Sequence, residues 1–460
     1  MFVIPGIIAI LAFVYIHPQE VYEWLRAVTV PMLVGLAAFG YVLDLRLGNT
    51  GQRRPTLMLW LAAAYWTWAI VTVAIRFPDS IIETIQTSMH SISLFLALAL
   101  GVSTLRGLRI VTMGLLSVTM LIGVIAIDQG LTPPVCVLPE SNDQVRAEVT
   151  PADTMVGKPC VARADCDDAT GREYACEHPG PMNTTSIFKR VRYRGILQDP
   201  NELAWTLSLA LPFAFAWYER RQAKGGFIIG PRIVVGAVVA ACILCNVMTQ
   251  SRSGQLSLLA ALGVYFVGRF GWRGIAAGAV VAAPLLLFGG RTDESSTEER
   301  LDCWAEALDL WREHPVFGAG AKHFTNYHHL TAHNSLLLTL AEMGPIGLVL
   351  FTALMYVALK TMLRARQHLT GRPEAAEARS FAFASTAALV GTLVSAFFLS
   401  IAYHPALWIA LGLAAAVQAT VWRHDPQWRL AWGWRDVVAV VGLDVVLVTA
   451  IAIYLRLKGH

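Results

Sequence analysis

Charged residues are scarce in this sequence. Only 15% of the 460 residues are Asp, Glu, Lys or Arg, whereas 55% are hydrophobic and the mean hydropathy is +0.53. A water-soluble domain carries about 25% charged residues, so this composition excludes that class and indicates a helical membrane protein with many spans. The positions of the few charges are therefore informative, because they indicate the side of the membrane on which each connection lies.

Signatures of several other protein classes are absent. The sequence contains neither a P-loop nor a Gly-x-Gly-x-x-Gly motif after a strand, so no cytosolic site for ATP or a sugar nucleotide is expected. Residues 2–16 are apolar without a basic n-region, which favours a retained first helix over a cleaved signal peptide. No internal repeat of the kind found in many transporters is visible. Energy for any reaction must come with the substrate or from a gradient.

Apolar runs predict an all-α polytopic membrane protein with about 12–13 transmembrane helices, since a span needs roughly 17–25 residues. The runs occupy residues 2–16, 27–44, 57–75, 81–102, 109–127, 201–218, 233–249, 253–268, 273–288, 335–358, 380–400, 405–421 and 437–455. Two longer polar segments, 128–200 and 289–334, separate N-terminal (1–127), central (201–288) and C-terminal (335–460) groups of helices.

Lys and Arg are distributed unequally between the connections. We assume that odd-numbered runs lead out of the cytoplasm. Most Lys and Arg residues then lie in cytoplasmic connections, and the short outward connections hold only Arg26, Arg76 and Arg252. By the positive-inside rule, segments 128–200 and 289–334 both lie on the outer face.

Four of the seven cysteines lie in the first outer segment: Cys136, Cys160, Cys166 and Cys176. In an exported segment they are candidates for two disulfides, with three possible pairings. Zinc is the less favoured interpretation because the spacing lacks two close pairs. Cys242 and Cys245 have C-x-x-C spacing but lie in an apolar run, where small packing residues are the better explanation.

A basic cluster closes the same segment. Residues 189–194 contain four cations, Arg192 and Arg194 among them, just before Gly195 and the turn at 199–201. The cluster could contact anionic headgroups or solvent. It could also form a phosphate clamp, in which guanidinium groups bind diphosphate oxygens. Arg194 is the stronger candidate for this role because Gly195 and the turn fix its position.

Arg252 lies in a very short turn, residues 249–255, between two predicted spans. An arginine at this interface can extend harmlessly to the headgroups. Arg252 is flanked by hydroxyl and amide side chains, however, and a polar cluster at membrane depth is a functional-site hypothesis by default. We therefore favour a functional role.

The second outer segment combines an amphipathic helix with a His-rich loop. Apolar residues at 301, 304, 308 and 311 share one helical face, with Arg300 and Arg312 near the two ends. Pro315 ends this helix, and residues 318–320 (GAG) form a turn before the loop. We expect the apolar face to lie on the membrane surface or on the spans.

His333 lies where the His-rich loop meets the apolar run beginning at residue 335. A neutral imidazole, with an unperturbed pKa of roughly 6.5, can take the proton of an attacking hydroxyl. Cations on the outer face, among them Lys322 and His329, outnumber carboxylates, which suits an anionic substrate such as a diphosphate and a leaving group that gains negative charge.

Two other interpretations of His333 stay open. Asn334 and the following serine supply good N-cap chemistry, so the segment could serve only to start a helix. His329 and His333 have His-x-x-x-His spacing, but no carboxylate accompanies them, so a metal site is disfavoured. We expect neither a metal nor another cofactor.

Taken together, these motifs resemble those of the O-antigen ligase family, which shares a domain with O-antigen polymerases. The matching pieces are Arg194-Gly195 with 199–204 (DPNELA), 249–254 (TQSRSG), 299–301 (ERL) with Trp304, 314–315 (HP) with 317–320 (FGAG), and 332–335 (AHNS) followed by 342–347 (EMGPIG). Each piece is short, whereas the ordered set, spanning residues 190–350, is specific.

The resemblance implies a metal-independent, inverting glycosyltransferase of the GT-C type in the bacterial inner membrane, with its active site on the periplasmic side. It would transfer a glycan from undecaprenyl diphosphate to an acceptor hydroxyl. His333 would be the base, while Arg194 and Arg252 would hold the diphosphate. Further candidate substrate contacts are Arg192, Arg300, Lys322, His329 and Asn334.

The acceptor differs among members of this family: lipid A-core for a ligase, a second lipid-linked glycan for a polymerase, a protein hydroxyl for an O-oligosaccharyltransferase. We favour ligase-type transfer to lipid A-core. We also expect contacts with membrane lipids and no nucleic-acid partner. A lipid-linked glycan transporter is the alternative from a different class. It is disfavoured because His90, Glu342 and Asp444 alone are candidates for ionisable residues deep within spans.

Overall fold

The computed structural model describes residues 2–48, 56–138, 155–167, 174–223, 225, 229–276, 278 and 295–459. Its helices are α1 (Val3–Ile16), α2 (Pro18–Val21), α3 (Val30–Arg46), α4 (Leu57–Arg76), α5 (Ile81–Gly101), α6 (Leu105–Leu131), α8 (Pro200–Ala223), α9 (Ile229–Thr249), α10 (Arg252–Phe270), α12 (Ser295–Glu313), α13 (Ser335–His368), α14 (Ala376–Phe398), α15 (Pro405–His424) and α16 (Trp434–Lys458). The short strands are β1 (Val135–Val137), β2 (Ala175–Glu177), β3 (Pro179–Gly180) and β4 (Thr184–Thr185).

The protein is an all-α polytopic membrane protein. Within the described ranges, eight helices are long and apolar enough to cross a membrane: α4, α5 with the turn before it, α6, α9, α13, α14 with the turn before it, α15 and α16. The predicted run at 273–288 lies largely outside the described residues.

Four further predicted spans form helices that are either too short or not apolar enough to be counted as membrane-crossing. Helix α1 has 14 residues and α3 has 17, while α8 and α10 have the length without the hydropathy. Helix α8 is apolar and buried between Leu203 and Ala216, but the polar residues at its two ends lower its mean hydropathy.

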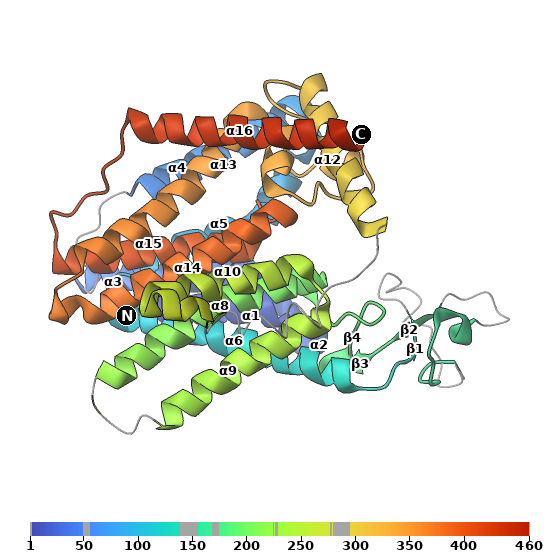
Figure 1. Ribbon diagram of the computed structural model, residues 1–460, viewed down its shortest axis with the longest axis horizontal. Helices are drawn as coiled ribbons and strands as arrows, with labels where there is room; N and C mark the ends of the chain where they lie inside the picture. The colour runs from blue at the N-terminus through green and yellow to red at the C-terminus, as the bar shows by residue number, and fades with distance from the viewer. Residues whose placement is uncertain are drawn as a thin grey trace.

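The bundle is built around α14, which packs against α8, α10, α13 and α15. Close approach of α10 and α14 depends on Gly391, whose carbonyl accepts a hydrogen bond from Ser257 Oγ at 2.8 Å. A side chain at Gly391 would come within 2.9 Å of the Ser257 carbonyl, so only glycine fits there. Helix α16 instead runs along one edge of the molecule (Figure 1), with many large apolar side chains exposed.

The two ends of the bundle differ in their connections (Figure 1). Strands β1–β4 and helix α2 lie at one end, which we call the large-loop end. At the opposite end, which we call the short-loop end, ion pairs join different helices. Arg109 Nε lies 2.9 Å and Arg220 Nε 3.1 Å from Glu377 Oε1. This gathering of arginines agrees with the predicted charge bias.

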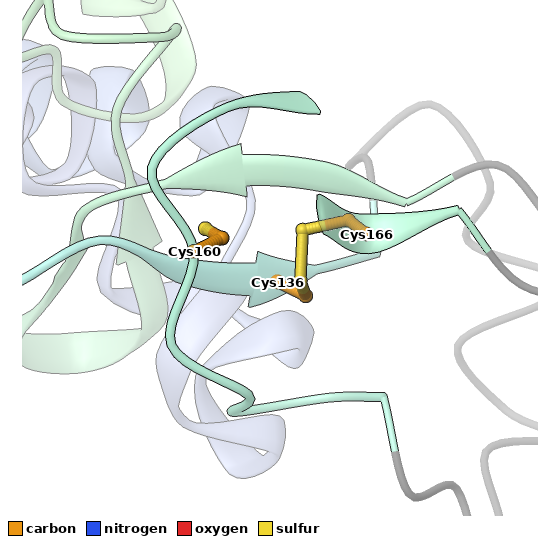
Figure 2. A group of neighbouring side chains, drawn as sticks. All are labelled: Cys136, Cys160 and Cys166. Atoms are coloured by element: carbon orange, nitrogen blue, oxygen red, sulfur yellow. A yellow bond between two sulfur atoms is a disulfide. The ribbon is translucent and has the colours of Figure 1, made fainter. Parts of the chain in front are cut away.

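The four cysteines of the first outer segment form two disulfides in the structure, Cys136–Cys166 and Cys160–Cys176. Strands β1 and β2 pair antiparallel with Cys136 opposite Cys176. Figure 2 shows the Cys136–Cys166 bridge with Cys160 beside it. Although these three sulfurs lie within 4.8 Å of one another, sulfurs in disulfides offer no thiolate to a metal. The bridges stabilise a lobe whose apolar core is very small.

Candidate active site

Helix α13 is interrupted at Gly344, and this break anchors the loop that precedes His333. Gly344 has φ +65°, and Pro345 has no N–H to continue the helix. Three carbonyls before the break accept hydrogen bonds from outside the helix. Their donors are Ala319 N (to Ala341 O, 2.8 Å), Gly320 N (to Glu342 O, 2.9 Å) and Trp68 Nε1 (to Met343 O, 2.8 Å). The segment with the FGAG motif (317–320) therefore packs directly against the helix break at the GPIG motif (344–347).

Glycine is required on both sides of this contact. Gly318 has φ +68°, and a Cβ there would lie 2.3 Å from the carbonyl carbon of Glu342. A Cβ on Gly344 would lie 2.2 Å from the Val316 carbonyl oxygen. Distances this short cannot be relieved by a side-chain rotation because both partners are backbone atoms. The two backbones thus meet directly, which fixes the start of the loop.

The carboxylate of Glu342 holds the next part of the loop. It is fully buried, and Oε1 accepts from Phe324 N at 2.9 Å, while Oε2 accepts from the Tyr403 hydroxyl at 2.7 Å. Glu342 therefore ties the 3₁₀ turn Phe324–Asn326 to the connection between α14 and α15. The structure gives this intramembrane acid a positioning role, and both of its oxygens have protein partners.

His333 occupies an unusual backbone conformation, with φ +47° in the left-handed region. Its neighbours on the C-terminal side hold it there. Asn334 Oδ1 accepts from Leu336 N (2.9 Å) and Leu337 N (3.1 Å), and Ser335 Oγ donates to Leu399 O (2.6 Å) and accepts from Ile401 N (2.8 Å). Asn334 thus caps α13, as the N-cap interpretation anticipated, while its role in substrate binding stays a prediction. Such local strain persists only where surrounding structure imposes it.

Charged groups from three segments surround the His333 imidazole. Burial, the largest cause, lowers its pKa below 6.5, and the positive charges of Arg300 and His328 lower it further, whereas Asp199 and Glu299 oppose the shift. The imidazole is therefore neutral at neutral pH and able to accept a proton. The carboxylates of Asp199 and Glu299 can stabilise the imidazolium that forms.

A chain of hydrogen bonds leads from Asp199 to the turn before Arg252. Asp199 Oδ1 accepts from Asn201 N and Nδ2, each at 2.8 Å. Asn201 Oδ1 accepts from Arg190 Nη2 at 3.1 Å, and Arg190 Nε donates to the Thr249 carbonyl at 3.0 Å. The DPNE and TQSRSG motifs are thereby joined beside the His333 site.

Arg252 is the first residue of α10 and is exposed. The preceding Ser251 caps the helix, because its Oγ accepts from Gly254 N at 3.0 Å. Arg300 lies on α12, partly exposed, and acts electrostatically on His333. The structure thus leaves the Arg252 guanidinium accessible to a ligand and brings Arg300 to the histidine.

Arg194 and Arg192 are held by protein atoms instead. Arg194 is nearly buried; its Nη2 donates to the Met182 carbonyl, and its Nη1 lies 4.0 Å from Glu20 of α2. Arg192 Nε donates to the Thr185 carbonyl at 3.0 Å. A phosphate contact from Arg194 would have to compete with Glu20, so its catalytic role stays a prediction.

Lys322 and His329 take different positions in the loop. Lys322 Nζ donates to Thr87 Oγ1 on α5 at 3.0 Å, and burial lowers its pKa to about 8, against the effect of Glu342. His329 is exposed, with its ring centroid 4.4 Å from that of His328. Within the described residues, His328, His329 and His333 do not gather as a three-ligand metal group.

Several neighbours of the site were not singled out from the sequence. Asp199 had been treated only as a turn residue, and its place in the DPNE motif was the available signal. His404 had not been considered; its Nε2 donates to the Ile196 carbonyl at 2.9 Å, and burial lowers its pKa to about 4. Glu202 lies 3.9 Å from the same imidazole. These groups support the 194–202 segment from the α14–α15 connection.

Comparison with known families bears directly on this arrangement. Residues 236–352 match the family model described as O-Antigen ligase. Residues 236–352 form an O-antigen ligase family domain. The domain starts within α9, ends within α13 and contains Arg252, Arg300 and His333. This confirms the predicted resemblance over that part of the chain, and the apolar helices described above make the protein a multi-pass membrane protein. Among curated proteins, none matches the chain.

Proposed function

We propose that this protein is an inverting, metal-independent glycosyltransferase of the bacterial inner membrane. It transfers a glycan from undecaprenyl diphosphate to an acceptor hydroxyl at the periplasmic face, with ligase-type transfer to lipid A-core favoured. The observation that carries the proposal is the environment of His333 within the O-antigen ligase family domain. A half-buried, neutral imidazole at the large-loop end is under the electrostatic influence of Asp199, Glu299 and Arg300.

The proposed chemistry follows from these groups. His333 removes the proton of the acceptor hydroxyl, whose oxygen attacks the anomeric carbon of the donor sugar. The bond between that carbon and the diphosphate oxygen breaks on the opposite face, and the diphosphate leaves with the bonding electrons. Arg252 and Arg300, with Arg194 if it releases Glu20, stabilise the growing negative charge. Asp199 and Glu299 stabilise the imidazolium.

An apolar cavity is suited to the polyprenyl chain of such a donor. It measures about 500 Å³ and lies between α1, α3 and α5, with Ile10, Tyr41 and Met89 among its lining residues. The outer end of α5 also carries Thr87, the partner of Lys322. A chain in this cavity would place its diphosphate near the cations of the large-loop end.

Reconstitution in liposomes tests the proposal. The purified protein is mixed with a glycan on undecaprenyl diphosphate and, separately, with lipid A-core, a second lipid-linked glycan or an acceptor protein. The product is expected on lipid A-core, and its formation should survive chelation. A product on another acceptor would correct the acceptor alone. Translocation of the donor without any transfer would instead support a transporter and contradict the proposal.

The pH dependence of transfer provides a prediction with a defined sign. Because the folded protein lowers the His333 pKa, the acid limb of kcat/KM should lie below pH 6.5. Arg300→Gln removes a positive charge that lowers this pKa, so the limb should move to higher pH. Asp199→Asn removes a negative charge that raises it, so the limb should move to lower pH. Shifts in the same direction for both variants would contradict His333 as the titrating base.

Arg252→Lys tests forked phosphate binding. Lysine keeps the charge but loses the paired N–H donors, and one charged hydrogen bond contributes roughly 1.5–3 kcal/mol, so kcat/KM should fall about tenfold or more. Arg312→Lys is the matched control, since Arg312 is exposed on α12 and pairs with Asp309. Wild-type turnover of Arg252→Lys in liposomes would mean that Arg252 only contacts headgroups.

A further inference from the structure

Positive charge is in excess around a cavity at the short-loop end, far along the bundle from His333. The cavity measures about 450 Å³ and lies between the ends of α8, α10, α13 and α14. Its charged lining residues are Arg269, Arg366, Arg379 and Glu219. Three arginines face one carboxylate, which leaves two positive charges in excess.

Glu219 is already engaged by other groups. Its Oε1 accepts from the Tyr265 hydroxyl at 2.7 Å and lies 3.4 Å from Arg269 Nε. Its Oε2 accepts from Ser380 Oγ. Glu219 therefore has partners at both oxygens, and Arg269 alone is enough to offset its charge.

Among the residues that the structure describes, neither Arg366 nor Arg379 forms an ion pair with a carboxylate. Arg366 is held in place, because its Nη2 donates to the Gly268 carbonyl at 3.0 Å and its guanidinium lies 3.7 Å from the centroid of the Phe383 ring. Arg379 is partly buried and makes no ion pair with any residue that the structure describes. Because Arg269 offsets the charge of Glu219 in the same cavity, the guanidinium groups of Arg366 and Arg379 are arranged to bind an anion.

An apolar groove adjoins the basic cavity and shares Glu219 and Arg269 with it. The groove measures about 370 Å³ and lies between α8, α9 and α10. Phe215 and Phe266 line it, and Val235 of α9 lies on its other side. Charge and apolar surface are thus continuous, which matches a molecule with an anionic head and a hydrocarbon chain.

We propose that the cavity and groove together bind an anionic glycerophospholipid of the adjacent leaflet. The lipid phosphate pairs with Arg366 and Arg379, and one acyl chain lies in the groove. The predicted orientation places this end at the cytoplasmic leaflet, where basic pockets between helices meet anionic headgroups. The lipid would bridge α8 and α10 to α13 and α14. This binding is independent of the transfer chemistry at His333.

Native mass spectrometry of the full-length protein in detergent tests the site. Wild-type protein is titrated with dioleoyl phosphatidylglycerol and, separately, with dioleoyl phosphatidylcholine. Phosphatidylglycerol is expected to bind at least tenfold more tightly, and Arg366→Gln/Arg379→Gln should reduce this preference to twofold or less. Arg423 is an exposed arginine in the last turn of α15, at the short-loop end. The control variant Arg423→Gln should keep the preference for phosphatidylglycerol. Equal binding of the two lipids by wild-type protein would overturn the proposal.

Two further measurements distinguish the contribution of the lipid headgroup from that of its acyl chain. Val235→Trp fills the groove while keeping every arginine, so it should weaken phosphatidylglycerol binding at least fivefold; unchanged binding would overturn the groove assignment. This variant also supplies the test if the double arginine variant does not fold. Inorganic phosphate at the same concentration should not displace the lipid. Displacement would identify free phosphate as the ligand and contradict the lipid proposal.

Discussion

Replacing His333 with alanine should reduce glycan transfer by roughly 100- to 10,000-fold, the usual contribution of a general base. The imidazole is the neutral group that the site provides for the acceptor proton, and Arg300 and the carboxylates around it act through it. The measurement is kcat/KM in liposomes with a lipid-linked glycan. The variant should still bind the donor, since the proposed diphosphate contacts are elsewhere.

His314→Ala is the matched control for this experiment. His314 lies in the same outer segment, at the end of α12, and its side chain contacts the Tyr327 ring at a centroid distance of 6.4 Å. It should keep transfer within about twofold of wild type, a change of roughly 0.5 kcal/mol, because His314 is not among the proposed substrate contacts. Transfer at wild-type rate by His333→Ala, with normal expression and a monodisperse elution profile, would contradict the base assignment.

The sequence could place most helices because long apolar runs leave the chain few alternatives in a bilayer. Runs such as 57–75 and 437–455 became α4 and α16 within a few residues. Helix α8 shows the limit of this reasoning, since polar residues at its two ends lower the mean hydropathy of a helix whose middle is apolar and buried. A mean over a window of span length therefore understates a helix whose apolar stretch is short.

The candidate site could be predicted in part from motifs, but not its pairings. His333, Arg252 and Arg300 were singled out by their positions at a membrane boundary, and all three lie within the matched domain. The partners of Arg194 could not be predicted, because Glu20 lies far away in sequence and belongs to another helix. The charges around His333 likewise come from separate segments, and only packing brings them together.

The cysteines show the same distinction between composition and pairing. Four cysteines in an exported segment predict two bridges, but three pairings were open. The structure joins Cys136 to Cys166 and Cys160 to Cys176, next to the β1–β2 pair that sets Cys136 opposite Cys176. Each bridge joins segments that only the folded lobe brings together, and no spacing rule contains that information.

Gly344→Ala should both destabilise the protein and abolish transfer. Alanine in the left-handed conformation costs roughly 1–3 kcal/mol, and its Cβ would also press on the Val316 carbonyl oxygen from 2.2 Å. Relief requires the 316–320 backbone to move, which would separate Ala319 N and Gly320 N from their acceptors and release the loop that leads to His333.

Thermal unfolding in detergent and transfer in liposomes together measure this effect. Gly263→Ala is the matched control: Gly263 lies within α10, and an added Cβ meets nothing within 4 Å. The control should keep its unfolding midpoint and its activity, while Gly344→Ala should lose several degrees and nearly all transfer. Because the loop is held by backbone contacts at the helix break, the loss should persist even where the variant inserts normally in the membrane. A Gly344→Ala protein with the midpoint and turnover of the control would mean that the break in α13 does not position the catalytic loop.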